Sequence, residues 1–322
     1  MRVLVTGCAG FLGFHLCEAL TRKPGYVVVG MDNLLKNNVD VQFEDLCNKS
    51  NFSFKKLDLC RPLHEGIEKC DFDLIYHLAA LNGTQEFYNR PWDVLKNSTL
   101  PNLNIIEFAQ MATKPVKIIY ASTSEIYAGS VSQGLSSVPT NETAQALIED
   151  VENVRWSYAV GKLTGEVALV AAAKQTRAEY TIIRYHNAYG PRMGINHVIP
   201  DYINRAMKGV YSLYGASNTR SFMYVDDVVS DTIALGENAN VKNQIVNIGS
   251  NEEITMLDLA HKINSLMGIS ADVEIFDAPK GSVSRRCPDV SKIDKLLGAQ
   301  KRTSLEDGLK KTISYYRENS NV

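Results

Sequence analysis

The chain has 322 residues, of which 45% are hydrophobic and 22% are charged, a balance that excludes disordered and fibrous proteins. Its 34 basic and 36 acidic residues leave a net charge of −2. A chain this close to neutral has no sequence-wide basic footprint, so we expect no nucleic-acid partner.

Membrane and disulfide signals are also missing from the sequence. No apolar run approaches the 18 residues that indicate a membrane span. Met1 leads directly into a strand-like run rather than a signal peptide. The six cysteines form no C-x-x-C pair, and we expect no metal site. Without a secretory signal, we also expect no disulfide framework. These features predict a cytoplasmic protein without a membrane partner.

Short β-branched runs alternate with amphipathic segments through the first half of the chain. The runs that resemble buried strands are residues 3–6, 27–31, 52–57, 74–77, 117–121 and 181–185. Helical patterns lie between most of them, for example at 11–22 and 103–111. This alternation predicts an α/β fold of the Rossmann type, a doubly wound parallel sheet that binds ligands at the carboxyl ends of its strands.

The rhythm changes after residue 192. Strands are predicted at 222–225 and 245–248, a helix near 256–267, and a last helix from Thr303, where Thr303 and Glu306 have capping-box spacing. Residues 129–141, rich in Ser, Gly and Pro, predict a loop. We expect a cofactor domain over residues 1–185, to which strands from about 222–248 return, and a smaller α+β substrate lobe over residues 186–322.

A glycine motif follows the first predicted strand and opens the first helix. Gly7, Gly10 and Gly13 have the spacing G-x-x-G-x-x-G, which suits a tight turn that brings backbone amides close to a pyrophosphate. Asp32 ends the next predicted strand, 19 residues after Gly13. A carboxylate there accepts from both ribose hydroxyls and repels a 2′-phosphate, so the pair of features predicts NAD rather than NADP.

Further motifs follow in a fixed order along the chain. They are Asp32-Asn33, Asp58-Leu59, His77-Leu78-Ala79-Ala80, Tyr158-x-x-x-Lys162, Asn187-Ala188-Tyr189-Gly190-Pro191-Arg192, Thr219-Arg220-Ser221-Phe222 and Arg285-Arg286-Cys287-Pro288-Asp289. With the glycine motif, they resemble the extended short-chain dehydrogenases over essentially the whole chain. The branch that they resemble is the NAD-dependent nucleotide-sugar epimerase/dehydratase family.

The resemblance implies a set of cofactor contacts. Asp58 and Leu59 would contact the adenine, and Ala79 and Ala80 would line the nicotinamide side. The full set of predicted NAD contacts is Gly7, Gly10, Phe11, Leu12, Gly13, Asp32, Asn33, Asp58, Leu59, Leu78, Ala79, Ala80, Tyr158 and Lys162.

Tyr158 and Lys162 stand four residues apart, which places both on one face of a helix. A cation beside a phenol lowers the phenol's pKa, as would the positive nicotinamide, so Tyr158 is the predicted general base for a sugar hydroxyl. By the resemblance, Lys162 would also hold the nicotinamide ribose. The family's catalytic hydroxyl, four residues before Tyr127, selects Thr123.

Glu125 bears on the type of reaction. The sequence Thr123-Ser124-Glu125 resembles GDP-mannose 4,6-dehydratases and UDP-glucuronate decarboxylases, whereas C4 epimerases usually carry small or aliphatic residues there. Once C4 is a ketone, a nearby carboxylate can remove the C5 proton and start elimination of water. A carboxylate on C5 would instead leave as carbon dioxide. We therefore favour dehydration or decarboxylation, with C4 epimerisation or plain 4-oxidation as the alternative.

Two departures leave the subtype open. The acid of dTDP-glucose dehydratases is replaced by Ser124, and the decarboxylases' Asp-Gly-Arg after Pro-Arg-Met is replaced by a sequence that begins at Gly194. The family's Asn-x-x-Gly-Thr helix appears with Pro101 and Asn102, and Pro101 is expected to start or kink a helix.

The nucleotide-sugar substrate would bind residues from several segments. Arginine forks suit a diphosphate because they bond in pairs and keep their charge. By the resemblance, arginines would neutralise the diphosphate, Asn187 would hold a phosphate or the sugar, and apolar side chains would flank the base. The predicted substrate set is Asn82, Gly83, Thr84, Asn187, Val198, Leu213, Tyr214, Arg220, Arg285 and Arg286.

A non-enzymatic interpretation is an NAD-binding sensor or scaffold, because fold does not determine function. Thr123, Tyr158 and Lys162 argue against it, since a sensor has no need to keep all three together. The resemblance further implies a homodimer formed by two helices of the cofactor domain.

Overall fold

The computed structural model describes residues 1–36, 39–63, 66–67, 69–176, 178–278 and 283–319, with the side chain of Thr84 left out. The chain forms two compact units. Unit 1 comprises residues 1–126, 148–184 and 229–246, and unit 2 comprises residues 127–147, 185–228 and 247–322.

Unit 1 is built on a seven-stranded sheet of order β11-β6-β5-β4-β1-β2-β3. Its strands are β1 (Arg2–Thr6), β2 (Val27–Asp32), β3 (Phe52–Lys56), β4 (Leu74–His77), β5 (Lys117–Thr123), β6 (Glu179–Tyr185) and β11 (Gln244–Ile248). The pairings from β3 through β5 are parallel. The strand order reverses beside β1, and ligands of doubly wound sheets bind at such a point. The predicted Rossmann-type fold is confirmed.

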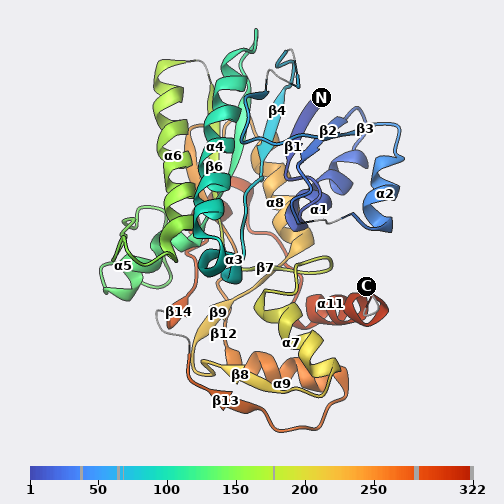
Figure 1. Ribbon diagram of the computed structural model, residues 1–322, viewed down its shortest axis with the longest axis vertical. Helices are drawn as coiled ribbons and strands as arrows, with labels where there is room; N and C mark the ends of the chain where they lie inside the picture. The colour runs from blue at the N-terminus through green and yellow to red at the C-terminus, as the bar shows by residue number, and fades with distance from the viewer. Residues whose placement is uncertain (37–38, 64–65, 68, 177, 279–282, 320–322) are drawn as a thin grey trace. The chain divides into compact units, whose positions relative to one another are not determined.

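Helices cover both faces of this sheet, as Figure 1 shows. They are α1 (Phe11–Thr21), α2 (Val41–Cys47), α3 (Thr84–Asn89), α4 (Pro91–Gln110), α6 (Trp156–Gln175) and α8 (Val225–Glu237). Helices α4 and α6 lie side by side. The main core of unit 1 fills the space between them and the sheet, with Ile75, Ile105, Ile118 and Leu169 almost fully buried. This packing holds α6 against β5 and brings the end of that strand beside the helix.

The C-terminal end of α8 is capped by a side chain from the sheet. The Nζ of Lys117 donates to the carbonyl oxygens of Leu235, Gly236 and Asn238 at 2.7, 3.1 and 3.0 Å. The last carbonyls of a helix have no partner within the helix, so this ammonium satisfies three acceptors at once. Lys117 thereby fastens α8 to β5.

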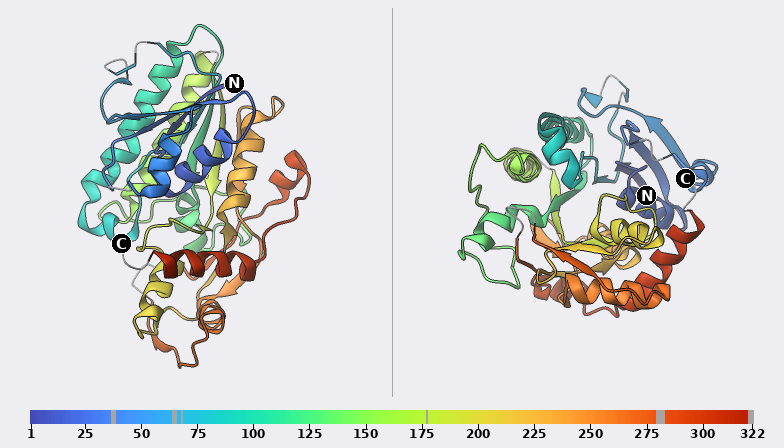
Figure 2. Two further views of the ribbon diagram at one scale, coloured as in Figure 1. Left: turned by 90° about the vertical axis from the view of Figure 1, so that its right-hand side faces the viewer. Right: turned by 60° about the horizontal axis from the view of Figure 1, so that its bottom comes forward.

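Unit 2 consists of small sheets and short helices. Its strands are β7 (Ala188–Tyr189), β8 (Ser212–Tyr214), β9 (Thr219–Ser221), β10 (Met223–Tyr224), β12 (Glu253–Thr255), β13 (Glu274–Phe276) and β14 (Arg285–Arg286). Its helical segments are α5 (Ala128–Ser132), α7 (Val198–Met207), α9 (Met256–Met267), α10 (Ser291–Leu297) and α11 (Leu305–Glu318), and a 3-10 turn at Ser124–Tyr127 leads into it. Figure 2 shows α11 beside α7 and α9, which it contacts.

The chain changes unit at residue 185, as expected, but it also changes unit at other positions. Residues 127–147 belong to unit 2 because their contacts lie there: the Tyr127 hydroxyl donates to Asn247 Oδ1 at 3.0 Å, and Thr140 pairs with Pro288. The expected strand at 222–225 is also different. Met223 and Tyr224 form β10, which pairs with β7 outside the large sheet, and Val225 already begins α8. Strand β11, by contrast, joins the seven-stranded sheet.

Three local details differ from the expectations. The predicted loop at 129–141 begins inside the short helix α5. Pro101 lies within α4, which starts at Pro91, so it does not start a helix, and the alternative expectation of a kink stays a prediction. Ser304 rather than Thr303 caps α11: its hydroxyl accepts from the Asp307 amide at 3.1 Å, while Thr303 N donates to Asp227. The capping pattern is the predicted one moved by a single residue.

In the part of the chain that the structure describes, none of the helices combines the length and the hydropathy needed to cross a bilayer.

Candidate active site

The glycine turn after β1 brings backbone atoms too close together for any side chain. Gly7 has φ +71°, and a Cβ there would lie 2.9 Å from the Ala79 amide nitrogen. A Cβ on Gly13 would lie 2.0 Å from the Gly7 carbonyl oxygen. Both positions therefore require glycine, the first to let the β4 end approach and the second to let α1 pack on the turn.

A cleft in unit 1 collects many of the predicted cofactor residues. Those that line it are Gly7, Gly10, Asp32, Asn33, Asp58, Leu59, Leu78, Ala79 and Ala80. Leu35, Lys36, Leu57, Leu81, Asn97 and Pro101 complete the lining and were not predicted from the sequence. Phe11, Leu12 and Gly13 stand in the first turn of α1 and do not line the cleft. The cleft lies at the carboxyl ends of β1, β2 and β4, where a doubly wound sheet binds its ligand.

Asp32 stands at the end of β2 with both carboxylate oxygens held by the backbone. Oδ2 accepts from the Ala9 amide at 3.1 Å, and Oδ1 accepts from the Leu34 amide at 2.8 Å. Burial raises the pKa of this carboxyl, and the backbone hydrogen bonds oppose that rise. Each oxygen keeps a second lone pair for a ribose hydroxyl. The glycine turn and this fixed acceptor fit a dinucleotide without a 2′-phosphate.

We expect Asp32→Ala to weaken NAD binding and to relieve discrimination against NADP, because the change removes both the ribose acceptor and the negative charge. Dissociation constants for the two cofactors, measured by calorimetry on cofactor-free protein, check this. Asp45→Ala, a change in the neighbouring α2, is the control and should leave the ratio as it is. Equal or tighter NADP binding by the unmodified protein would refute the assignment.

The predicted catalytic residues also lie in unit 1. Thr123 is the last residue of β5, and its Oγ1 accepts from the Glu125 amide at 3.2 Å. Tyr158 and Lys162 stand one turn apart on the buried side of α6, and Tyr158 belongs to a small apolar cluster with Leu81 of the cleft, against which Ala80 packs. These contacts place the phenol beside the predicted nicotinamide end of the cofactor site.

Burial, rather than a neighbouring cation, has the largest effect on the pKa of Tyr158, the predicted general base. The pKa of Tyr158 is raised by burial and then by the Glu125 carboxylate. Burial also lowers the pKa of Lys162 to about 7, against the opposing charge of Glu166. The Lys162 Nζ lies 6.0 Å from the centroid of the Tyr158 ring. Lys162 therefore does not lower the pKa of Tyr158 as expected in the protein without its cofactor. The positive nicotinamide is the other group that was expected to lower this pKa.

A chain of buried hydrogen bonds connects the end of β1, just before the glycine turn, to α6, which carries Tyr158 and Lys162. His77 Nδ1 lies 2.7 Å from Thr6 Oγ1, and His77 Nε2 lies 3.0 Å from Asn102 Oδ1. Asn102 Nδ2 donates to the Ser98 carbonyl and, at 3.3 Å, to that of Gly161. Since the Asn102 oxygen must accept, His77 carries its proton on Nε2. Burial and Lys162 lower the His77 pKa to about 3, so the ring stays neutral.

A buried ion pair supports the same helix from the other side. The Glu166 carboxylate accepts from Arg184 Nε at 3.0 Å and Nη2 at 2.7 Å, and also from the Ser122 hydroxyl. The Glu166 and Arg184 side chains are 4% and 7% exposed. These contacts join β5, α6 and β6 one residue from Thr123. Sequence reasoning missed both this pair and Asn102, although Glu166 stands four residues after Lys162, on the same helical face.

Of the arginines predicted to bind a diphosphate, two are brought together in unit 2. Strand β14 pairs with β9 in parallel, with Arg286 opposite Arg220. Arg285 points to the other face of β14, because side chains alternate along a strand. Its Nε donates to both Glu253 carboxylate oxygens at 3.0 Å, in an exposed ion pair. The sequence could not distinguish Arg285 from Arg286 without the register of β14.

The remaining predicted substrate residues have different surroundings. In unit 2, Asn187 Nδ2 donates to the Ser221 carbonyl at 2.9 Å, Leu213 is buried, and Val198 is exposed. Tyr214 is exposed and stacks on Phe276, with ring centroids 5.2 Å apart, a neighbour that the sequence did not indicate.

The predicted substrate loop lies in unit 1. The Asn82 carbonyl accepts from Lys36, which lines the cleft. Gly83 is buried, has φ +143° and precedes α3. The side chain of Thr84 lies outside the described part of the structure.

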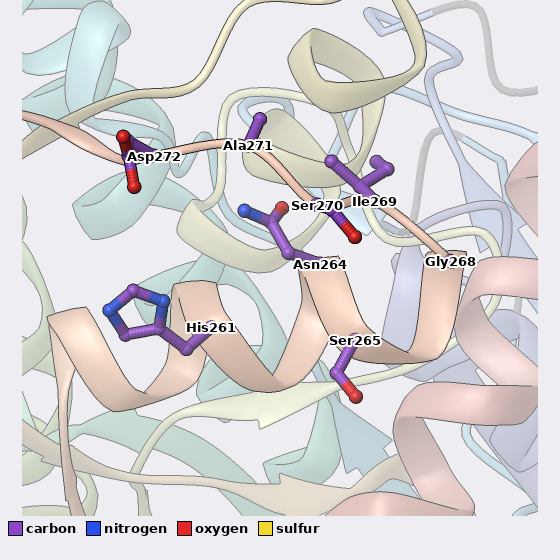
Figure 3. Close-up of a pocket in the computed structure, with 8 residues that line it drawn as sticks. All are labelled: His261, Asn264, Ser265, Gly268, Ile269, Ser270, Ala271 and Asp272. Carbon is purple, nitrogen blue, oxygen red and sulfur yellow. The ribbon is translucent and has the colours of Figure 1, made fainter.

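A separate cavity in unit 2 lies at the C-terminal end of α9 and is drawn in Figure 3. Its lining comprises His261, Asn264, Ser265, Gly268, Ile269, Ser270, Ala271 and Asp272. This lining includes none of the predicted catalytic, cofactor or substrate residues, so the cavity is assigned no part in the chemistry of the active site. Among the described residues, no cluster of His, Cys, Asp or Glu could hold a metal ion.

A family model described as "NAD dependent epimerase/dehydratase family" matches residues 3–249. The chain belongs to this family. The match covers the seven-stranded sheet and the cleft described above, and it confirms both the resemblance found in the sequence and the NAD dependence. The chain is thus an NAD-dependent enzyme of the epimerase/dehydratase type.

Individual relatives span almost the whole chain. A UDP-N-acetyl-alpha-D-glucosaminuronate decarboxylase from Bacillus cytotoxicus is 33% identical over 99% of both chains. UDP-glucuronic acid decarboxylase 1 from Danio rerio is 33% identical over 98% of this chain and 72% of its own. A crystal structure of UDP-glucuronic acid 4-epimerase from Bacillus cereus, in complex with UDP-glucuronic acid and NAD, is 28% identical over 99% of this chain and 100% of its own, with a TM-score of 0.88. Decarboxylases and an epimerase therefore stand side by side among the relatives of this family member.

Proposed function

We propose that this enzyme is an NAD-dependent decarboxylase of a UDP-hexuronic acid. Two decarboxylases that it resembles over nearly its whole length act, by name, on acidic UDP-sugars, and the epimerase structure contains one. The observation that carries the choice of reaction is Glu125, a carboxylate held at the end of β5 beside Thr123 and acting electrostatically on Tyr158.

The chemistry of such a substrate explains why C4 oxidation comes first. NAD, held by the glycine turn and the cleft residues, would supply the hydride acceptor for this oxidation and the hydride for the final reduction. Removal of the hydroxyl proton and the C4 hydride leaves a ketone that is β to the C5 carboxylate. The C5–carboxylate bond then breaks, carbon dioxide leaves, and the electron pair is held as an enolate over C4 and C5. Protonation at C5 and reduction at C4 complete a redox-neutral cycle.

The side chains of this chain are assigned to these steps as follows. Tyr158 takes the C4 hydroxyl proton and gives it back, Thr123 hydrogen-bonds the same oxygen, and Lys162 would hold the nicotinamide ribose. The glycine turn, Asp32 and the cleft residues would hold NAD. Arg220 and Arg286 would bind the diphosphate, as the resemblance implies, since guanidinium groups bond phosphate oxygens in pairs.

A panel of nucleotide sugars tests the proposal. The purified protein is incubated with UDP-glucuronic acid, UDP-N-acetylglucosaminuronic acid and UDP-glucose, and the products are analysed by mass spectrometry. We expect the two acidic substrates to lose carbon dioxide and UDP-glucose to give no decarboxylated product. Loss of water would indicate a dehydratase. Conversion without change of mass, with inversion at C4, would contradict the proposal.

The second candidate is a UDP-hexuronic acid 4-epimerase, which the Bacillus cereus structure favours. Glu125→Gln distinguishes the two reactions. If Glu125 acts as an acid–base group at C5, we expect bound NADH and a 4-keto sugar to accumulate in the variant, with turnover slower by roughly two to four powers of ten. In a decarboxylase, where no proton has to leave C5, Glu125 would place the substrate carboxylate, and turnover should also fall. Gln preserves the size of the side chain. An epimerase breaks no bond at C5, so a variant that turns over at the native rate would favour epimerisation.

A homodimer and a cytoplasmic location remain predictions. Helices α4 and α6 carry exposed apolar side chains, among them Leu100, Leu103 and Val167, on the faces that point away from the sheet. These are the two helices that we assign to a dimer contact, because a second copy would cover that apolar surface. We expect Leu103→Glu to convert the dimer to monomer in sedimentation experiments, whereas Val27→Glu, an exposed position on β2, should not. A monomeric unmodified protein would refute this assignment.

A further inference from the structure

An ion pair in unit 1 links the two segments that carry the predicted catalytic residues. Arg155 Nη2 lies 3.1 Å from Glu125 Oε2, and the two side chains are 15% and 22% exposed. The pair spans 30 residues of sequence, so it is a tertiary contact and not a local one. The guanidinium carbon lies 5.7 Å from the centroid of the Trp156 ring, which is itself buried. Two partners thus restrict the orientation of the Arg155 fork.

The location of this pair relates it to the reaction. Arg155 immediately precedes α6, three residues before Tyr158, and Glu125 follows Thr123 by two residues in the turn after β5. The Glu125 amide also donates to Thr123 Oγ1. Arg155 therefore fixes the Glu125 carboxylate to the helix that carries Tyr158, while the backbone fixes it to the strand that carries Thr123.

The charge of Glu125 poses a problem for an acidic sugar. The predicted reaction places C4 at Thr123 and Tyr158, and the substrate carboxylate is attached to the adjacent carbon, C5. Two carboxylates at such short range repel each other unless a cation lies between or beside them. A guanidinium group keeps its charge at every accessible pH and offers N–H donors in a planar fork, so Arg155 can hold the Glu125 carboxylate and offset its charge.

We propose that Arg155 is a positioning residue that holds Glu125 in place and offsets its charge, so that a nucleotide sugar with a carboxylate on C5 is accepted beside Tyr158. This inference rests on the proposed function for the identity of the substrate. It assigns a role to a residue that the sequence motifs did not single out. Because Arg155 acts through Glu125, its contribution depends on the presence of the Glu125 charge.

A double-mutant cycle tests this dependence. The variants are Arg155→Gln, Glu125→Gln and the combination, each assayed for kcat and KM with UDP-glucuronic acid. We expect Arg155→Gln to lower kcat/KM by roughly tenfold to a hundredfold, the range for loss of a charge-assisted hydrogen bond, with an increase in KM. The double variant should be no worse than Glu125→Gln alone, because the charge that Arg155 offsets is gone. Arg155→Lys should recover part of the loss.

A matched control is Arg22→Gln, since Arg22 also pairs with a glutamate, Glu18, at 3.0 Å, but on the exposed surface of α1 and its C-terminal cap. It should behave like the unmodified enzyme. Thermal unfolding of every variant reports whether the fold is intact, and the lysine variant serves if the glutamine variant does not fold. Multiplicative effects of Arg155→Gln and Glu125→Gln would overturn the proposal, because Arg155 would then act independently of Glu125.

The proposed function and this inference fail in different ways. If the unmodified enzyme releases no carbon dioxide from any UDP-hexuronic acid, the proposed function is wrong. The cycle is then repeated on the nucleotide sugar that does reduce bound NAD, with NADH absorbance as the readout. An effect of Arg155→Gln that disappears in the Glu125→Gln background supports the positioning role, and one that persists undiminished overturns it.

Discussion

Tyr158→Phe is expected to slow the reduction of bound NAD by substrate by roughly two to four powers of ten, the usual effect of removing a positioned proton acceptor. The change deletes one oxygen and keeps the ring that stacks on Phe87, with centroids 5.4 Å apart, and that packs against Leu81. NAD affinity and the unfolding temperature should therefore change little. Stopped-flow absorbance of NADH after addition of substrate measures the rate.

Tyr88→Phe is the control for this experiment, because Tyr88 lies exposed on α3, one residue from Phe87. It should leave the rate as it is. A Tyr158→Phe enzyme that reduces NAD at nearly the native rate would show that another group takes the C4 hydroxyl proton.

Arg184→Met is expected to lower the free energy of unfolding by about 3–5 kcal/mol, because it leaves the Glu166 carboxylate buried without its cation. Glu166 accepts two hydrogen bonds from Arg184 and lies beside Ser122, in a part of unit 1 with almost no solvent access. Urea unfolding, followed by circular dichroism, measures the change. The variant should also lose activity, since α6 carries both Tyr158 and Lys162.

A surface ion pair provides the comparison. Lys242 and Glu179 are 3.0 Å apart, with side chains that are 54% and 34% exposed. Lys242→Met should change the free energy of unfolding by at most about 1 kcal/mol, the value typical of exposed pairs. Similar losses for Arg184→Met and Lys242→Met would contradict the structural role assigned to the buried pair.

The large sheet was predictable because most of its strands are short, buried and β-branched, and several of them are followed by a helix. Strand order then brings the ends of β1, β2 and β4 together, which is why the glycine turn, Asp32 and Ala79 line one cleft. Elements of two or three residues were less predictable. Strand β10 is defined by its pairing with β7, and the strand face of Arg285 depends on the register of β14 with β9, so neither follows from local sequence.

The charged and polar partners of the residues in and around the predicted active site could not be predicted from the sequence either. Tyr158 and Lys162 were found by their spacing, but Arg155, Asn102 and Arg184 meet Glu125, His77 and Glu166 through tertiary packing. The pKa of Tyr158 also differs from the expectation. Its spacing from Lys162 predicted a lowered pKa, whereas burial raises the pKa. Desolvation depends on the whole fold and has no local sequence pattern.

We propose that this enzyme oxidises C4, releases carbon dioxide from C5 and reduces C4 again within one catalytic cycle. UDP-glucuronic acid that carries deuterium at C4 tests this sequence of steps, with the product analysed by mass spectrometry and NMR. We expect a decarboxylated sugar that still carries deuterium at C4, with hydrogen from solvent at C5. A product that retains its carboxylate, or one that loses carbon dioxide but has ordinary hydrogen at C4, would refute the proposal.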